Sequence, residues 1–137
     1  MAAVKDLIAV EADGSISFGN NELDEKAKKS DFEVRGDLYK VKTFRGATRL
    51  ERNDAMVYES DPGTVVWNFA EDEQGVSFTL ESEKDCQVVL GLTDGAAYKV
   101  VINGNDAGVM DTVMGGKLVL SVEVDEDCRA EIRVIRV

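Results

Sequence analysis

Apolar and polar residues alternate along most of the chain, and this period of two constrains the fold more than any other feature of the sequence. Turn residues interrupt the alternation every six to ten positions. Successive side chains of a β-strand point to opposite faces, so the pattern predicts short strands with one buried face. The clearest examples are Val76/Phe78/Leu80, Cys86/Val88/Leu90/Leu92, Tyr98/Val100/Ile102, Leu118/Leu120/Val122/Val124 and Cys128/Ala130/Ile132/Val134. We therefore expect an all-β protein, an antiparallel β-sandwich of jelly-roll type.

Chain length and turn signals indicate a single β-sandwich domain over residues 1–137. A chain of 137 residues can bury one core without disulfide or metal support. Asp13-Gly14 and Asn103-Gly104 are typical of tight hairpin turns, because their residues tolerate positive φ. Residues 20–30 form the one stretch compatible with a helix, since Asn21 could cap it and lysines end it. We expect at most one short helix, near residues 21–29, or a charged loop.

Two segments in the second half of the chain resemble each other. Residues 78–90 read FTLESEKDCQVVL, and residues 120–132 read LSVEVDEDCRAEI. Both follow the order strand, acidic turn, Asp-Cys, strand, which indicates two similar hairpins. If pseudo-symmetry relates them, Cys86 and Cys128 could lie close together. Negative neighbours raise the pKa of a thiol, so we expect both cysteines to be unreactive.

The composition excludes several classes of site. The chain has no histidine, which removes the commonest general base, zinc ligand and partner of a catalytic serine or cysteine. It has 27 acidic residues, so a carboxylate pair at glycosidase spacing would arise by chance and carries no information. Residues 103–108, NGNDAG, lack the ligand spacing of a strong calcium site. We expect no catalytic residue, no metal and no cofactor.

Net charge and hydropathy restrict the partners and the location. The formal net charge of −11 repels nucleic acid and anionic membrane surfaces, so neither is an expected partner. No apolar run approaches the roughly 18 residues of a membrane span, and the N-terminus lacks the continuous apolar region of a signal peptide. We expect no membrane insertion and a cytoplasmic location with reduced thiols.

The only tryptophan, Trp67, admits two interpretations. Alternation places Val65, Trp67 and Phe69 on one face, and burying an indole there contributes a few kcal/mol, so we interpret Trp67 as core. The alternative is an aromatic platform for a sugar ring, with Trp67 and Tyr39 as its candidate residues. Exposure of either ring would favour that alternative.

Basic residues are concentrated in residues 26–52. This segment holds nine of the 16 Lys and Arg but only four acidic residues, whereas the rest of the chain is strongly acidic. A basic segment can bind the acidic face of a second copy, and such non-identical surfaces build rings or filaments. The alternative is that the charges protect strand edges from aggregation. The last strand, residues 130–137, could add main-chain pairing at a sheet edge. The candidate self-association residues are Lys40, Lys42, Arg45, Arg49 and Arg52.

Several stretches resemble a known family. They are DLIAVEADGSISFGNNEL, DFEVRGDLYKVKT, TRLERND and YESDPGTVVWNF, and the likeness is best over residues 4–80. They are similar to small all-β proteins of clostridial-type anaerobic bacteria that often carry the label endosialidase. The resemblance implies an all-β fold and, through that label, a glycosidase acting on acidic sugars, with no assigned catalytic residues to transfer. Residues 90–124 also resemble β-sandwich modules appended to carbohydrate-active enzymes, which implies the same fold.

These observations leave three hypotheses for function. The first is a non-catalytic structural or interaction protein that forms homo-oligomers through complementary charged surfaces and edge strands. The second is a carbohydrate-binding module with a glycan as its partner. The third is an endosialidase-like glycosidase, which a pocket containing both arginines and carboxylates would favour. The lack of histidine, the unreactive cysteines and the segregated charge favour the first.

Overall fold

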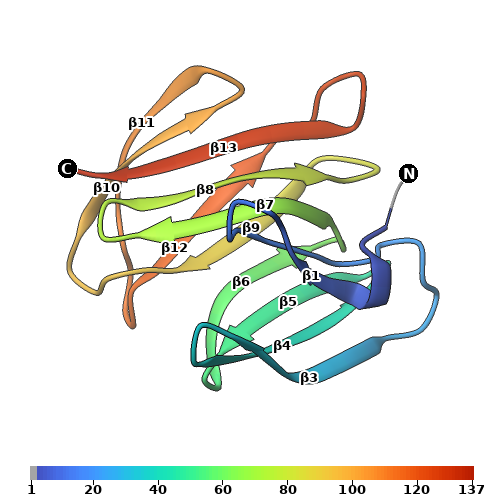
Figure 1. Ribbon diagram of the computed structural model, residues 1–137. Helices are drawn as coiled ribbons and strands as arrows, with labels where there is room; N and C mark the ends of the chain where they lie inside the picture. The colour runs from blue at the N-terminus through green and yellow to red at the C-terminus, as the bar shows by residue number, and fades with distance from the viewer. Residues whose placement is uncertain (1–2) are drawn as a thin grey trace.

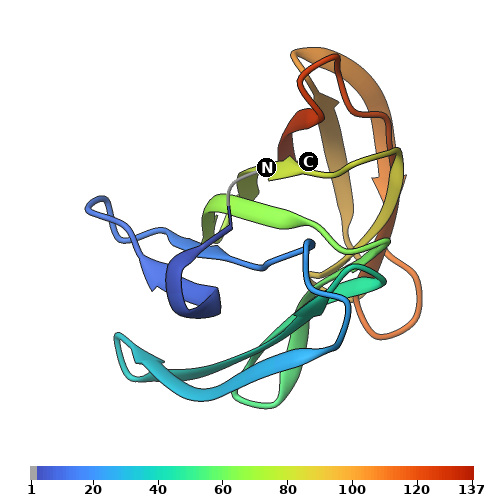
Figure 2. The same ribbon diagram turned by 90° about the vertical axis from the view of Figure 1, so that its right-hand side faces the viewer.

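The computed structural model describes residues 3–137 and consists of two antiparallel β-sheets packed face to face (Figure 1, Figure 2). Sheet A has the strand order β1-β2-β7-β8-β13-β10-β11. Its strands are β1 (Ile8–Val10), β2 (Ile16–Phe18), β7 (Val65–Asp72), β8 (Gly75–Glu81), β10 (Ala97–Ile102), β11 (Asn105–Asp111) and β13 (Arg129–Arg136). Sheet B has the order β12-β9-β6-β5-β4-β3. Its strands are β3 (Ala27–Val34), β4 (Asp37–Phe44), β5 (Ala47–Arg52), β6 (Ala55–Asp61), β9 (Cys86–Gly91) and β12 (Lys117–Val122).

The core lies between the sheets and follows the alternation of the sequence. In β8 and β13 the buried residues face each other, with Phe78 opposite Ile132 and Leu80 opposite Ala130. Four aromatic rings contact one another in the core at centroid distances of 5.3 to 6.2 Å, those of Phe18, Tyr58, Phe69 and Phe78. Aromatic pairs of this kind contribute about 0.5–1.5 kcal/mol each beyond the area that they bury. The predicted all-β sandwich is confirmed.

A chain of buried hydroxyl groups joins β4, β5 and β6 to the residue before β7. Thr48 Oγ1 accepts the N–H of Thr64 (3.0 Å), donates to the Thr64 carbonyl (2.8 Å) and lies 2.8 Å from Thr43 Oγ1. Thr64 Oγ1 lies 2.7 Å from the phenol oxygen of Tyr58 and 2.9 Å from Ser60 Oγ. These five side chains are at most 1% exposed, so each hydroxyl needs a partner inside the protein. Burial raises the pKa of Tyr58 well above its usual range, which keeps the phenol neutral.

The chain passes repeatedly between the sheets, as in a jelly roll. β8 and β9 lie in different sheets, and so do β12 and β13. Residues 78–90 and 120–132 are therefore two crossovers, which corrects their interpretation as hairpins. The crossovers pair with each other, since β8 lies beside β13 and β9 beside β12. The two similar segments thus occupy equivalent, mutually paired positions in the sandwich.

Residues 21–29 form no helix, so of the two predictions for this stretch the short helix is wrong, and the charged loop holds for the residues before β3. Turns precede β3 there, and the Asn20 side chain stabilises one of them by accepting the N–H of Glu22 (3.0 Å). A helix would have offered only Leu23 and Ala27 as its apolar side, which is too little to bury against a core. Pairing with β4 satisfies the backbone instead. The one helical element of the described residues is a short 3₁₀ turn, η1 (Lys5–Leu7).

A β-bulge in β7 turns Trp67 away from the core. The register with β8 shifts after Trp67, and Asn68 adopts a left-handed φ of 57°. Phe69 faces the core, whereas Trp67 is half-buried and lies opposite Thr79, outside the core cluster. The interpretation of Trp67 as a core partner of Phe69 is therefore wrong. A bulge adds a residue and reverses the side chains after it, which strict alternation cannot reveal.

Within residues 3–137 the edge strands are β1 and β11 in sheet A and β3 and β12 in sheet B. β13, which carries most of residues 130–137, is flanked by β8 and β10. The suggestion that this last strand could pair with another copy at a sheet edge is therefore wrong. A separate result concerns membranes: none of the helices in residues 3–137 has the length and apolar character needed to cross one.

Candidate functional site

The outer face of sheet B changes in charge from one edge to the other. The register places Lys28 opposite Lys42, Lys42 opposite Arg49, and Arg49 opposite Glu59, in one row across β3 to β6. The same row reaches the far edge on β12 at Val119, which is 43% exposed. The basic segment predicted from the sequence is thus displayed mainly along the β3 edge of this sheet.

Arg49 has its charge compensated within the molecule. Its Nη1 donates to Glu59 Oε2 (2.7 Å) and its Nε donates to Glu51 Oε2 (2.9 Å). These two hydrogen bonds, that of Glu59 first, raise the pKa of the guanidinium above its ordinary value. Arg49 therefore contributes little free charge to the surface.

The lysines of the same face have no such partners. Lys28, Lys40 and Lys42 form no ion pair with any residue in 3–137. Lys28 and Lys42 are also cross-strand neighbours, and like charges placed directly opposite each other destabilise a sheet. Lys40 lies opposite Glu51, but that carboxylate pairs with Arg49 instead. Lys28 and Lys42 have only cationic neighbours across the strands, and an external anion would relieve this repulsion.

The remaining two predicted binding residues lie elsewhere. Arg45, in the turn after β4, pairs with Asp24 (3.0 Å), and both side chains are mostly exposed. Arg52 lies opposite Tyr39 and reaches sheet A, where it pairs with Glu71. Burial, the largest single cause, acts to lower the pKa of Arg52, but the hydrogen bonds and charges of Glu71 and Tyr39 together outweigh it and the pKa is raised. The structure brings Lys40, Lys42 and Arg49 together and separates Arg45 and Arg52 from them.

A groove of about 550 Å³ lies at the opposite edge of sheet B, between β12 and the tip of the β10–β11 hairpin. Its floor includes Ile102 and Val122, and no Lys or Arg of the described chain lines it. Lys99 lies outside the lining and reaches one groove carboxylate, that of Asp106, at 3.6 Å. The carboxylates of the lining belong to Asp61, Asp85, Asp106 and Glu123. Sequence reasoning missed this groove, because its walls come from segments far apart in the chain.

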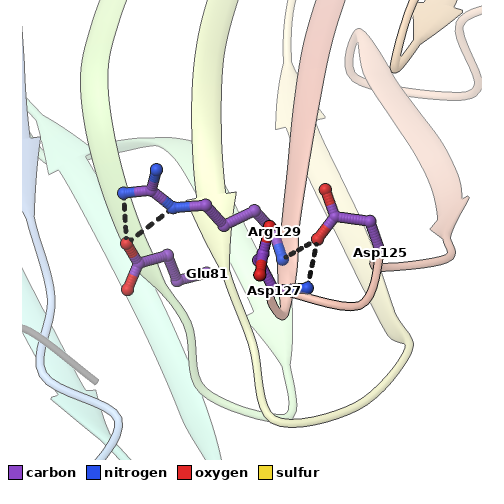
Figure 3. Close-up of polar contacts among 4 residues, drawn as sticks. All are labelled: Glu81, Asp125, Asp127 and Arg129. Carbon is purple, nitrogen blue, oxygen red and sulfur yellow. Dashed lines mark hydrogen bonds and ion pairs between the residues drawn. The ribbon is translucent and has the colours of Figure 1, made fainter.

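The turn beside the groove is held by its own hydrogen bonds (Figure 3). Glu81 Oε1 accepts from Arg129 Nε (3.0 Å) and Nη2 (2.7 Å). The Glu81 hydrogen bonds and charge raise the pKa of Arg129. Asp125 Oδ1 accepts the backbone N–H groups of Asp127 (2.9 Å) and Arg129 (3.0 Å). Arg129 is thus engaged with Glu81, and the groove carboxylates are not neutralised by it.

The two candidate sugar-platform residues differ in exposure. Tyr39 is 6% exposed and belongs to the core, so its ring face is closed to a ligand. Trp67 lies on the outer face of sheet A in one row with Thr79 and Glu131. A depression of about 350 Å³ lined by these two residues and by Arg133 lies on the same face. Trp67 Nε1 is buried without a hydrogen-bond partner among residues 3–137, so packing alone orients this edge of the ring.

A cleft of about 390 Å³ at one end of the sandwich contains both arginines and carboxylates. Each carboxylate there already has a partner: Glu71 binds Arg52, Asp13 accepts from Ser15, and Asp37 accepts from Asn53 (3.0 Å). Arg35 Nη1 donates to the Gly14 carbonyl (2.9 Å). The arginines and carboxylates of the cleft are therefore hydrogen-bonded to groups of the same chain.

Cysteine and metal chemistry find little support in the geometry. Burial, as the largest cause, raises the pKa of the Cys86 thiol to about 11, and both thiols are free. No group of three His, Cys, Asp or Glu side chains in residues 3–137 is placed to hold a metal ion. Asn103, in the predicted hairpin turn, accepts the N–H of Glu131 through Oδ1 (2.8 Å).

Comparison of the chain with protein-family models, with curated proteins and with solved structures finds no match. Function is therefore inferred from the geometry of this chain.

The sequence predicted the basic segment but did not single out Lys28, because that residue was placed in the expected helix. The sequence indicated this position in one way: Lys28 and Lys29 closely precede the strand-like stretch DFEV, and the strand could have been extended back to Ala27 to include them.

Proposed function

We propose that the protein is a non-catalytic structural protein that self-associates through complementary charged surfaces. The observation that carries this proposal is the uncompensated lysine group, Lys28, Lys40 and Lys42, at one edge of sheet B. The groove with its four carboxylates lies at the other edge of the same sheet. Complementary patches of this kind steer association and fix which surfaces meet.

Contacts between two different surfaces are heterologous and lead to head-to-tail assembly. Such contacts close into a ring when the rotation between copies permits, and they otherwise extend as a filament. The partner is then a second copy of the chain. A cytoplasmic location is part of the proposal, and the two free cysteines are compatible with a reducing compartment.

The test is the mass of the purified protein in solution by light scattering, at about 0.01 M and about 1 M salt. The Debye length falls from about 30 Å to about 3 Å between these conditions, which removes most surface attraction. We expect assemblies well above the 15.0 kDa monomer at low salt and their dissociation at high salt. A monomer at both salt concentrations would refute the proposal.

A second candidate function, binding of a neutral glycan, is favoured by the position of Trp67. The bulge at Asn68 places this half-buried ring on the outer face of sheet A beside polar side chains, where a sugar ring could stack. Trp67 is the only tryptophan, so its fluorescence reports directly on an occupied site. A panel of neutral oligosaccharides should then change the emission, and Trp67→Ala should abolish binding measured by calorimetry. Phe44→Ala, which alters a half-buried ring on sheet B, is the control.

A further inference from the structure

The edge strands differ in how well they could accept another strand. β1 has three residues. In β3 the register shifts between Lys29 and Phe32, and in the β10–β11 pair it shifts beside Gly108, which has a φ of +94°. Bulges of this kind twist an edge away from new partners. β12 instead pairs with β9 along its whole length without any register shift. Val113 forms a bridge with Lys117 at the start of β12, so the open part of this edge is residues 118–122. Among the edges described, β12 is therefore the one regular edge that stays open over more than three residues.

The acidic groove meets this regular edge where β12 ends, and it continues across the end of β6 and the start of β9. Ser121, Val122 and Glu123, at the end of β12 and just after it, line the groove together with the tip of the β10–β11 hairpin. Along β12 the exposed and buried residues alternate strictly. Glu123 continues the exposed series of Lys117, Val119 and Ser121, so its carboxylate lies on the outer side of sheet B, at the end of the strand away from Lys117. A strand added to β12 here would have carboxylates beside it.

The directions of the strands decide how a second copy would fit. Each neighbouring pair in sheet B is antiparallel, and the sheet has six strands. β3 and β12 at its two edges therefore run in opposite directions. A second copy whose sheet B continues the first sheet, with the ordinary twist between neighbouring strands, brings its β3 antiparallel to β12. The outer face of sheet B then stays on the same side in both copies.

The first half of β3 has the properties that this position requires. Residues 27–29 pair regularly with β4 and precede the bulge. Lys28 lies on the outer face and has no ion-pair partner among the described residues, and Lys26 is held over the same face, 5.7 Å from the ring centroid of Phe44. A lysine on the outer face of β3 would thus lie on the same side as Glu123 of the neighbouring copy.

We propose that residues 26–29 of one copy add to the free edge of β12 in the next copy, with Lys28 directed to the carboxylates of the groove. This inference depends on the proposed self-association and assigns the two surfaces that meet. Main-chain hydrogen bonds along β12 supply affinity, and the lysine–carboxylate contacts select the partner edge. Joining β3 to β12 makes sheet B continuous from copy to copy.

The experiment uses charge reversal on each side of the contact in the full chain. Lys28→Glu and Glu123→Lys should each reduce the mass at low salt to that of the monomer, 15.0 kDa. An equimolar mixture of the two variants should assemble again, because each variant supplies the charge that complements the other. The double variant Lys28→Glu/Glu123→Lys should assemble by itself.

Two matched controls separate this contact from a general effect of charge. Glu126→Lys makes the same change in the neighbouring acidic turn but outside the groove, and Lys5→Glu reverses an exposed lysine far from β3 in the chain. Both should assemble as the unchanged protein does. Circular dichroism checks that each variant is folded.

The outcomes distinguish this inference from the broader proposal. If the unchanged protein assembles and dissolves with salt but Glu123→Lys has no effect, the assigned contact is wrong and self-association stands. If both single variants are monomeric but neither their mixture nor the double variant assembles, direct pairing of these positions is wrong. A monomeric unchanged protein would refute both proposals.

Discussion

Strands β4 and β5 carry polar side chains on both of their faces, and the two sets differ in whether they have partners within the molecule. On their inner side Thr43 and Thr48 are fully buried, and each hydroxyl has a partner. On the outer side, Lys42 of β4 faces Lys28 of the neighbouring strand β3, and neither forms an ion pair with any of residues 3–137. Buried polar groups need hydrogen-bond partners within the molecule for the chain to fold, whereas exposed charges are solvated by water and can still bind an external partner. The inner surface therefore serves the fold, and the outer one is available for association.

The largest effect on folding is expected from Thr48→Val. Valine keeps the shape of the side chain but removes the acceptor for the Thr64 N–H and the donor to the Thr64 carbonyl. Leaving such groups unpaired in the interior costs about 1–3 kcal/mol. Chemical denaturation should show this loss in the free energy of unfolding. The comparison fails if the loss is negligible, or if the folded variant no longer assembles.

The next effect should come from the thiol of Cys86 at alkaline pH. Its pKa is raised from 9.0 to about 11 by burial, so the unfolded chain loses this proton at lower pH than the folded protein. The group contributes no pH dependence below pH 9.0 and lowers stability as the pH rises from there towards 11. Between pH 9 and 11 the free energy of unfolding, measured by chemical denaturation at each pH, should fall less steeply with pH for Cys86→Ala than for the unchanged protein. An identical dependence on pH in the variant would contradict the raised pKa of the Cys86 thiol.

A smaller effect is expected from Arg49→Ala on the outer face. The change removes two hydrogen-bonded ion pairs, to Glu51 and Glu59, on a partly exposed side chain. Surface pairs of this kind contribute under about 1 kcal/mol and are weakened by salt. Denaturation at low and high salt should show a modest loss that shrinks as salt is added. A loss as large as that of Thr48→Val would erase the distinction between the two surfaces.

The smallest effect on folding, with the opposite sign, is expected from Lys28→Gln. Glutamine keeps an unbranched polar side chain, shorter by one atom, and removes the repulsion from Lys42 on the neighbouring strand. We expect the free energy of unfolding to rise by a few tenths of a kcal/mol at low salt and to be unchanged at high salt. A clear loss of stability at low salt would show that Lys28 already has a stabilising partner within the molecule.

The regular parts of the sandwich were predictable from the sequence. The alternation of β8 and β13 placed Phe78 and Ile132 correctly in the core, because both faces of these strands keep a constant environment. The position of Trp67 was not predictable, since the bulge depends on one residue, Asn68, adopting a left-handed conformation. The helix near residues 21–29 was preferred locally, but pairing with β4 decided the structure.

Half of the candidate site could be predicted in the same way. The basic segment is continuous in the sequence, so its charge was visible without a structure. The groove brings together Asp61, Asp85, Asp106 and Glu123 from four separate stretches of chain, and only the folded topology makes them neighbours. The similarity of residues 78–90 and 120–132 was visible, but their mutual pairing required knowledge of the crossovers.

The position of β3 and β12 at opposite edges of one sheet also predicts the symmetry of an assembly. Strands lie about 4.8 Å apart, so each copy of the six-stranded sheet B would advance a continuous ribbon by roughly 29 Å. Neighbouring strands are rotated by about 20–25°, which amounts to roughly 120–150° for each copy. Such a ribbon would complete a turn in roughly 2.4 to 3 copies. Fibre diffraction or electron microscopy of negatively stained filaments could measure this pitch directly.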